Sequence, residues 1–314
     1  MKFDVLVIGE LNVDLILNEI ESIPEIGKEK LARTMSLVLG SSSAILACNL
    51  SSLGNRVGFI GKIGRDDFGG LVLRNLEMKN VDRSLIIQDA QCNTGATIVL
   101  NFDQDRAMVT YPGSMEQLTL REIPVSEFRN ARHLHLSSYF LQKALKQDTG
   151  HIFRIAKQAG LTTSIDIQWD PHEQWDFNYK EVLPFIDVFL PNEAEITQLT
   201  GEPDLHSAVR KLKDFGRIIV VKCGERGSWL WKDNEMIHVP AFVNDSIVDA
   251  IGAGDSFNAG FIHQFLMGAS MQQCLVFGNL MGAISTTAPG GTAAFTDYKD
   301  IMNTARKRFN FEGE

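Results

Sequence analysis

A glycine-rich turn that leads into an apolar segment constrains this chain more than any other feature. Residues 248–260 read Val-Asp-Ala-Ile-Gly-Ala-Gly-Asp-Ser-Phe-Asn-Ala-Gly, and an apolar, helix-favouring segment continues to Leu266. Glycine lets the backbone approach a ligand closely, and the first amide groups of a helix have no acceptor within the helix. Because the helix dipole adds positive potential at the same end, the turn predicts an anion-binding site.

Asp255 directly follows the turn and places a carboxylate beside the predicted anion. Amide groups that hold negative charge, together with a carboxylate that takes a proton from a hydroxyl, are suited to phosphoryl transfer. The same residues would also fit an ordinary helix start with Asp255 as the cap. No G-x-x-x-x-G-K-[ST] motif occurs, and the glycines do not fit G-x-G-x-x-G, which disfavours a P-loop protein and a dinucleotide-dependent dehydrogenase.

The bulk properties of the 314 residues restrict the partners of the protein. Its net charge is −9 and it has no basic block, so we do not expect nucleic acid as a partner. The four cysteines form no C-x-x-C pair, which fits a reducing cytoplasm. No stretch approaches the ~18 apolar residues of a membrane span, so no membrane partner is expected.

Strand-like and helix-like segments alternate along the chain and predict an α/β fold with a mostly parallel sheet. The apolar run Phe3–Ile8 contains an acid and reads as a buried central strand rather than a signal peptide. Residues 94–101 and 106–111, on either side of Asp103-Gln104-Asp105, predict a β-hairpin. We expect residues 1–314 to form one domain, a size that α/β sheets often reach.

Two polar pairs follow predicted strands. Asn12 and Asp14 alternate on an extended segment, so they face the same way and could bind sugar hydroxyls, although a polar surface strand would look the same. Asn192 and Glu195 are three residues apart at the start of a predicted helix and share one face. Acids in a first turn are also normal helix-start chemistry, so both interpretations of this pair stay open.

Residues 249–255 resemble the D-T-x-G-A-G-D signature of the ribokinase-like carbohydrate kinases, the phosphofructokinase B family, with Ala250 in place of the usual Thr. The similarity extends through Ser256-Phe257-x-Ala259-Gly260 and covers nearly the whole chain. It implies a large, mostly parallel sheet flanked by helices, with a small β-sheet lid. It also implies that Asp255 is the catalytic base. The amides implied to hold the phosphate charge are those of Gly252, Ala253 and Gly254.

The resemblance also implies where the sugar binds. Family members hold the sugar with an Asp at the position of Asp14, and lid segments at about 12–35 and 93–115 cover it and often pair two subunits. A homodimer through the lid is therefore expected. The residues implied to face the sugar are Asn12, Asp14, Gly40 and Ser41. Departures from the family pattern are Ser41 for the second Gly, Ile45 for a sugar-binding Asn, and Gln168 and Asp170 within the D-P-N-x-R stretch.

The cofactors follow from the same resemblance. The family's N-x-x-E motif, here Asn192 and Glu195, positions Mg²⁺ largely through water. The strand ending at Lys222 and the following G-x-x-G turn run beside ATP, and a residue at the position of Asn279 lies on the adenine side. In many relatives the loop 289–292 and the region of Asp249 bind a monovalent cation, which makes K⁺ a candidate. The two turn glycines are Gly224 and Gly227.

These observations predict a cytoplasmic, ATP- and Mg²⁺-dependent kinase that phosphorylates a hydroxyl of a small sugar. A nucleoside kinase would share the core motifs and differ in the lid. A sugar-binding sensor without catalysis is disfavoured by the retained Asp255, Asn192 and Glu195. The sequence does not name the sugar.

Overall fold

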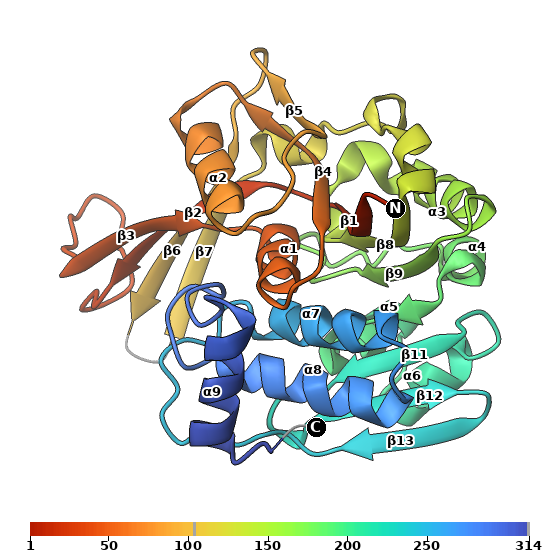
Figure 1. Cartoon of the computed structure of the whole chain (residues 1–314). Coiled ribbons are helices and arrows are strands. Elements are labelled where there is room, and N and C mark those ends of the chain that lie inside the picture. The colour runs from red at the N-terminus through yellow and green to blue at the C-terminus, as the bar shows by residue number, and fades with distance from the viewer. Residues whose placement is uncertain (103–104, 313–314) are drawn as a thin grey trace.

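The computed structural model describes residues 1–102 and 105–312, and its strands and helices alternate as predicted (Figure 1). The described residues form a nine-stranded sheet and a separate four-stranded sheet. Only β12 and β13 are antiparallel to their neighbours in the large sheet, which confirms the predicted α/β class. The large sheet has the spatial order β13 (Glu235–Val239), β12 (Ser228–Lys232), β11 (Ile218–Lys222), β10 (Val188–Phe189), β9 (Thr162–Asp166), β8 (Ala131–Ser137), β1 (Phe3–Ile8), β4 (Val57–Gly64) and β5 (Ile86–Asp89).

The strand β1 is apolar along most of its length because helices cover both faces of the sheet. It pairs in parallel with β4 on one side and β8 on the other. Val5 and Val7 pack toward one layer of helices, whereas Leu6 and Ile8 pack toward the other. This burial on both faces is typical of a central parallel strand and confirms the interpretation of the N-terminal run.

The helices form two layers, one on each face of the large sheet. The layer on the Val5 side contains α1 (Ser42–Ser52), α2 (Asp67–Met78), α7 (Ala253–Leu266) and α8 (Met271–Ser285). The opposite layer contains α3 (Thr149–Gln158), α4 (Tyr179–Val182), α5 (Glu193–Thr200) and α6 (Leu205–Leu212). The last helix, α9 (Tyr298–Phe309), packs on α8 (Figure 1).

The four-stranded sheet projects from the large sheet beside α2 (Figure 1). Its order is β3 (Thr34–Leu39), β2 (Asn12–Asn18), β6 (Gly95–Phe102) and β7 (Asp105–Tyr111). The antiparallel pairing of β6 with β7 confirms the predicted hairpin strands, while residues 103–104 of its turn lie outside the described residues. β3 pairs in register with β2 as far as Leu39, a few residues beyond the first predicted lid segment at about 12–35, and the role of this sheet as a lid stays a prediction.

The carboxyl ends of the parallel strands meet at one edge of the large sheet. β1, β9 and β11 end there at Ile8, Asp166 and Lys222, and β2 of the smaller sheet begins four residues after β1. In open α/β sheets this edge is where ligands bind. None of the helices described in the structure is long and apolar enough to cross a membrane.

Candidate active site

The helix α7 begins at Ala253, so Asp255 lies within its first turn. Gly252 occupies the N-cap position with φ of 74°, a left-handed conformation that glycine adopts without strain. A Cβ at this position would lie 2.8 Å from the Cα of Gly291, so the turn requires glycine. Among the described residues, no side chain caps this helix. The Ala253 amide donates to the carbonyl of Ala250 at 3.3 Å, so in the described part of the chain the amides of Gly252 and Gly254 are the ones left to meet a ligand.

The Asp255 carboxyl is buried, with only 6% of the residue exposed, and accepts a hydrogen bond of 2.9 Å from Nε2 of Gln168. The alternative in which Asp255 caps its own helix does not describe this arrangement, because Gly252 is the N-cap. Burial raises the pKa of Asp255 to about 7, and the charge of Asp166 acts in the same direction. A carboxyl with a pKa near neutral is suited to accept a proton from an alcohol.

A buried ion pair lies beside Asp255 at the carboxyl edge of the sheet. Nζ of Lys222 lies 2.6 Å from Oδ2 of Asp166, which is fully buried. Asn258, one helical turn after Asp255, donates to the same carboxylate and accepts from Lys222 Nζ at 3.3 Å. Burial lowers the pKa of Lys222, but the opposing charges of Asp166 and Glu195 outweigh it and raise the pKa overall. Lys222 is therefore a fixed cation.

The Lys222 ammonium also lies close to the glycine turn. A Cβ at Gly254 would be 3.8 Å from Lys222 Nζ. The charge of Lys222 thus adds to the dipole of α7 at the place where an anion would meet the first amides. The prediction that the strand ending at Lys222 runs beside ATP is compatible with this position.

Asn192 and Glu195 form a capping box at the start of α5. Oδ1 of Asn192 accepts from the Glu195 amide at 2.8 Å, and the Glu195 carboxylate accepts from the backbone and side-chain amides of Asn192 at 2.9 and 2.7 Å. The helix-start interpretation therefore describes this pair well. Burial, together with the charge of Asp166, raises the pKa of Glu195 to about 7.

A divalent cation fits the balance of charge in this region. The carboxyls of Asp166, Glu195 and Asp255 all act on the single ammonium of Lys222, so three acidic groups share one cation. The described residues contain no group of three or more His, Cys, Asp or Glu side chains arranged to hold a metal directly. Mg²⁺ usually retains several waters and binds through one or two carboxylates, so a water-mediated site near Glu195 is compatible with both observations.

The structure brings Asn12, Asp14 and Gly40 together at the start of the smaller sheet. Nδ2 of Asn12 donates to Oδ1 of Asp14 at 2.9 Å. A Cβ at Gly40 would lie 2.3 Å from this Asp14 oxygen, so only glycine leaves room for the carboxyl. Burial raises the pKa of Asp14 to about 6, against the hydrogen bond from Asn12. The pair is close enough to act on one ligand, as the alternation predicted.

Ser41 and Ile45 have structural contacts at this end. The Ser41 hydroxyl donates to the carbonyl of Glu10 at 2.6 Å and accepts from the amide of Ala44 at 2.9 Å, so it caps α1. Ser41 therefore has little hydrogen-bonding capacity left for a sugar. Ile45 is buried against the glycine turns: a Cβ at Gly291 would lie 2.9 Å from its Cδ1.

The predicted ATP-side residues lie in and beside the turn after β11. Gly224 and Gly227 have φ of 56° and 83°, and a Cβ at Gly227 would lie 2.0 Å from the carbonyl oxygen of Val239. Asn279, on α8, is buried rather than solvated, and its side-chain amide donates to the carbonyls of Val239 and Pro240 at 3.0 and 3.1 Å. Asn279 thus fixes the chain segment after β13.

Asp249 links the two loops predicted to hold a monovalent cation. Its Oδ1 accepts from the amide of Ile251 at 2.9 Å, and its Oδ2 accepts from the amide of Gly290 at 2.9 Å. The carboxylate therefore holds the loop before α7 against the loop after α8. This proximity agrees with the segments paired by the resemblance, and K⁺ binding itself stays a prediction.

Sequence reasoning missed three residues that contact this site directly. Asp166 and Gln168 stand in a stretch noted only for its resemblance, and Asn258 fills an unspecified position of the glycine signature. The available signal was a polar residue in an apolar segment, because Asp166 ends a buried strand and Asn258 lies one turn beyond Asp255 on an apolar helix. The hydrogen bond between Asn258 and Asp166 joins α7 to β9, and periodicity along the chain does not reveal such a contact.

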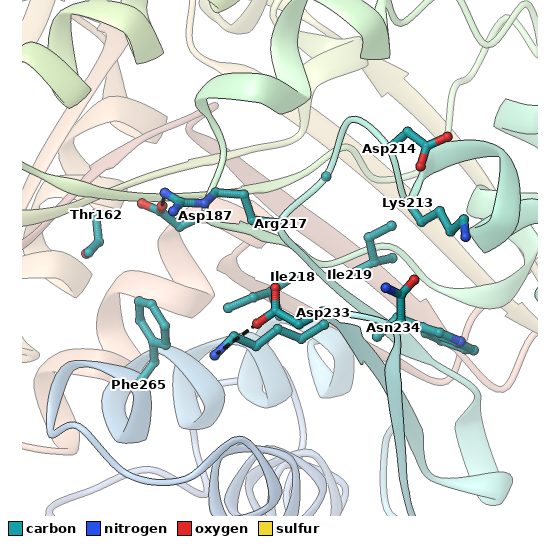
Figure 2. Close-up of a pocket in the computed structure, with 13 residues that line it drawn as sticks. Thr162, Asp187, Lys213, Asp214, Arg217, Ile218, Ile219, Asp233, Asn234 and Phe265 are labelled. Carbon is teal, nitrogen blue, oxygen red and sulfur yellow. Dashed lines mark hydrogen bonds and ion pairs between the residues drawn. The ribbon is translucent and has the colours of Figure 1, made fainter.

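A cavity of about 520 Å³ lies at the opposite edge of the sheet, away from these groups (Figure 2). Thr162 and Ile218, the first residues of β9 and β11, both line it. Figure 2 shows Arg217 paired with Asp187 on its wall. None of the residues predicted for the site lines this cavity, so the chemistry belongs to the carboxyl edge.

Known proteins resemble the chain over nearly its whole length. The chain is 29% identical over 302 residues to the 2-dehydro-3-deoxygluconokinase of Bacillus subtilis, covering 92% of this chain and 91% of that protein. It is 32% identical over 295 residues to the ATP-dependent ribose-1-phosphate kinase of Halopiger xanaduensis, covering 93% and 95%.

Solved structures share the fold. The ribokinase of Arabidopsis thaliana complexed with ribose and ATP has a TM-score of 0.83 at 24% identity, covering 96% of this chain and 98% of that one. An E. coli protein in complex with ATP and Mg²⁺ has a TM-score of 0.84 at 22% identity, covering 98% and 100%. Residues 2–297 match the model of the pfkB family carbohydrate kinases. The chain therefore belongs to the pfkB family of carbohydrate kinases, as its glycine signature predicted.

Proposed function

We propose that this protein transfers the γ-phosphoryl group of ATP to a hydroxyl of a small sugar. The observation that carries the proposal is the buried Asp255 carboxyl in the first turn of α7, with a pKa near 7 and the Lys222 ammonium close by. Its family membership and the named relatives, which act on sugars and sugar derivatives, support the same conclusion.

In the proposed reaction, Asp255 accepts the proton of the sugar hydroxyl as that oxygen attacks phosphorus. The amides of Gly252, Ala253 and Gly254 and the ammonium of Lys222 hold the negative charge of the transferred group. Asp166 and Asn258 keep Lys222 in place. Phosphoryl transfer depends mainly on such positioning and charge stabilisation.

Mg²⁺ would be held near Glu195 and Asn192 through water, where it would neutralise phosphate charge. Glu195, whose burial makes ionisation costly, would then gain a second positive neighbour in addition to Lys222. Gly224, Gly227 and Asn279 would shape the nucleotide side of the site. We propose K⁺ near Asp249 as a further cofactor.

Asn12 and Asp14 would bind the sugar, since their side chains lie together and Asn12 is buried while Asp14 is partly buried. The smaller sheet would act as a lid on a single domain of residues 1–314, in a cytoplasmic enzyme. One face of that sheet also exposes apolar side chains, which supports a homodimer formed through the lid. These side chains include Met35, Leu37, Ile98, Val109 and Tyr111.

A coupled assay for ADP tests the proposal. The purified protein is incubated with ATP, Mg²⁺ and a panel of sugars, sugar acids, sugar phosphates and nucleosides, with and without K⁺. We expect ADP release that depends on one class of sugar. Turnover only with nucleosides would favour a nucleoside kinase, and no acceptor-dependent ADP release across the panel would favour a binding protein without catalysis.

A further inference from the structure

Gln168 has a backbone conformation that glutamine rarely adopts. Its φ is 60°, in the left-handed region, two residues after the end of β9. In this region the Cβ of an ordinary residue crowds the following carbonyl, so such residues persist only where the surrounding structure holds them. A strained residue beside a buried carboxylate therefore invites a functional explanation.

The conformation places the Gln168 amide between two carboxylates. Nε2 lies 2.9 Å from Oδ1 of Asp255 and 3.3 Å from Oδ2 of Asp166. The backbone amide of Gln168 also donates to Oδ1 of Asp166, at 3.2 Å. A side-chain amide has two donors, so both are used, one on each acid. Gln168 thus separates two like charges and fixes one oxygen of Asp255.

The loop that carries Gln168 is braced independently of the site. Asp170 is buried and accepts hydrogen bonds from the backbone amides of His172, Gln174 and Trp175 at 3.0, 3.0 and 2.8 Å. These hydrogen bonds fix the loop that follows Gln168, while β9 fixes the chain that precedes it. The position of the Gln168 amide is therefore imposed by the fold from both directions.

We propose that Gln168 is a positioning residue that fixes Oδ1 of Asp255 and leaves Oδ2 directed at the acceptor hydroxyl. The proposal rests on the proposed kinase function, because it assigns the geometry of that reaction. With Oδ1 engaged, the carboxylate cannot rotate freely, and the remaining oxygen can accept the proton when the hydroxyl attacks. Near-attack geometry of this kind contributes to kcat rather than to the affinity for the sugar.

Charged groups from four directions face Asp255, and Gln168 opposes the effect of the acids among them on the pKa of Asp255. Asp166 on β9, Glu10 after β1 and Glu195 on α5 are acids, whereas Lys222 on β11 is the cation. The hydrogen bond from Gln168 lowers the pKa of Asp255 against burial and the charge of Asp166. Loss of the amide should therefore move the acidic limb of the pH–rate profile to higher pH.

The test uses Gln168→Asn and Gln168→Gly, with Glu173→Gly as the matched control. Asn and Gly both tolerate φ near 60°, so both variants should fold, but neither can bridge the two carboxylates. Glu173 has φ of 52° in the same loop and an exposed side chain, so its replacement relieves strain without altering the site. We expect kcat to fall about 10- to 100-fold in both Gln168 variants, the loss associated with one hydrogen bond to a charged group. The KM for the acceptor should change less than about threefold, and the control should keep wild-type kcat.

A second measurement separates this proposal from the kinase assignment. Carboxyl-carbon NMR of ¹³C-labelled protein follows the titration of Asp255, whose signal is identified by its loss in Asp255→Asn. We expect the pKa of Asp255 to rise in both Gln168 variants and to stay at the wild-type value in Glu173→Gly. Unchanged kcat, pH profile and Asp255 titration would overturn the proposal. If the wild type phosphorylates no acceptor while the titration still shifts, the kinase function fails and the control of Asp255 by Gln168 stands.

Discussion

Replacing Asp255 by Asn should inactivate the enzyme and stabilise the fold at the same time. The burial that raises the pKa of Asp255 from its ordinary value of 3.8 to about 7 makes ionisation costly in the folded protein. At about 1.4 kcal/mol per pH unit, this rise corresponds to about 4 kcal/mol. Asn has nearly the same shape and cannot ionise, so it removes the cost together with the proton acceptor.

The direction of the pH dependence follows from proton binding. Between pH 4 and pH 7 the folded protein binds a proton at Asp255 that the unfolded chain does not bind. The contribution of Asp255 to stability therefore improves as the pH falls through this range, and its penalty is complete only above pH 7. Asp255→Asn should raise the free energy of unfolding by about 4 kcal/mol at pH 8 and by about 1.5 kcal/mol at pH 5.

Urea unfolding at the two pH values measures these free energies, and the ADP assay measures turnover. We expect kcat to fall by about 10²- to 10⁴-fold, the range of general-base catalysis. Asp214→Asn is the control, because Asp214 is exposed, and it should change stability by less than about 0.5 kcal/mol. An equal gain in the free energy of unfolding at pH 8 and pH 5 would refute the inference that the ionised Asp255 carboxylate destabilises the folded protein. Near-wild-type turnover of Asp255→Asn would show that Asp255 is not the catalytic base.

Three other substitutions test the surrounding structure. Lys222→Met leaves the fully buried Asp166 carboxylate without its cation and should lower the free energy of unfolding in urea by about 3–5 kcal/mol. Lys211→Met breaks an exposed ion pair and should lower it by at most about 1 kcal/mol. Equal losses of stability in the two variants would contradict this reasoning. Gly40→Ala places a Cβ 2.3 Å from a carboxyl oxygen of Asp14 and should displace that carboxyl. The KM for the sugar should then rise at least about tenfold, because one hydrogen bond to a charged group is lost. An unchanged KM would exclude Asp14 from sugar binding. Ile45→Ala opens a cavity beside Gly252 and Gly291 and should lower the free energy of unfolding by about 2–5 kcal/mol. A loss below about 1 kcal/mol would show that the Ile45 side chain is not packed against these glycines.

The sequence predicted the fold well because the fold depends on local patterns. The apolar run of β1, the hairpin strands β6 and β7, and the glycine turn before α7 each carry their signal within a few residues. The end of β3 was harder to define, since this strand alternates only loosely between apolar and polar residues and is held by its pairing with β2. Strand boundaries set by a partner cannot be read from one segment alone.

The site was predictable where a motif named its residues and not where distant elements meet. Asp255 was found from its position after the glycine turn, yet its partner Gln168 was not, because glutamine is not expected at positive φ. Ser41 was expected to face the sugar, and the structure shows its hydroxyl hydrogen-bonded to Glu10 and Ala44 as the cap of α1. Long-range contacts decide such cases.

The energetic cost of the site is itself an argument for its function. Asp166, Glu195 and Asp255 are buried around one ammonium, and the pKa values of Glu195 and Asp255 are raised to about 7. Burying carboxyls without enough positive charge lowers stability, and apolar residues of similar size would avoid the cost. A chain shaped for stability alone would not retain this cluster at the end of a helix that already attracts anions. The cluster is therefore better explained by a ligand that brings both positive and negative charge, which is what a hydrated cation bound to a nucleotide provides.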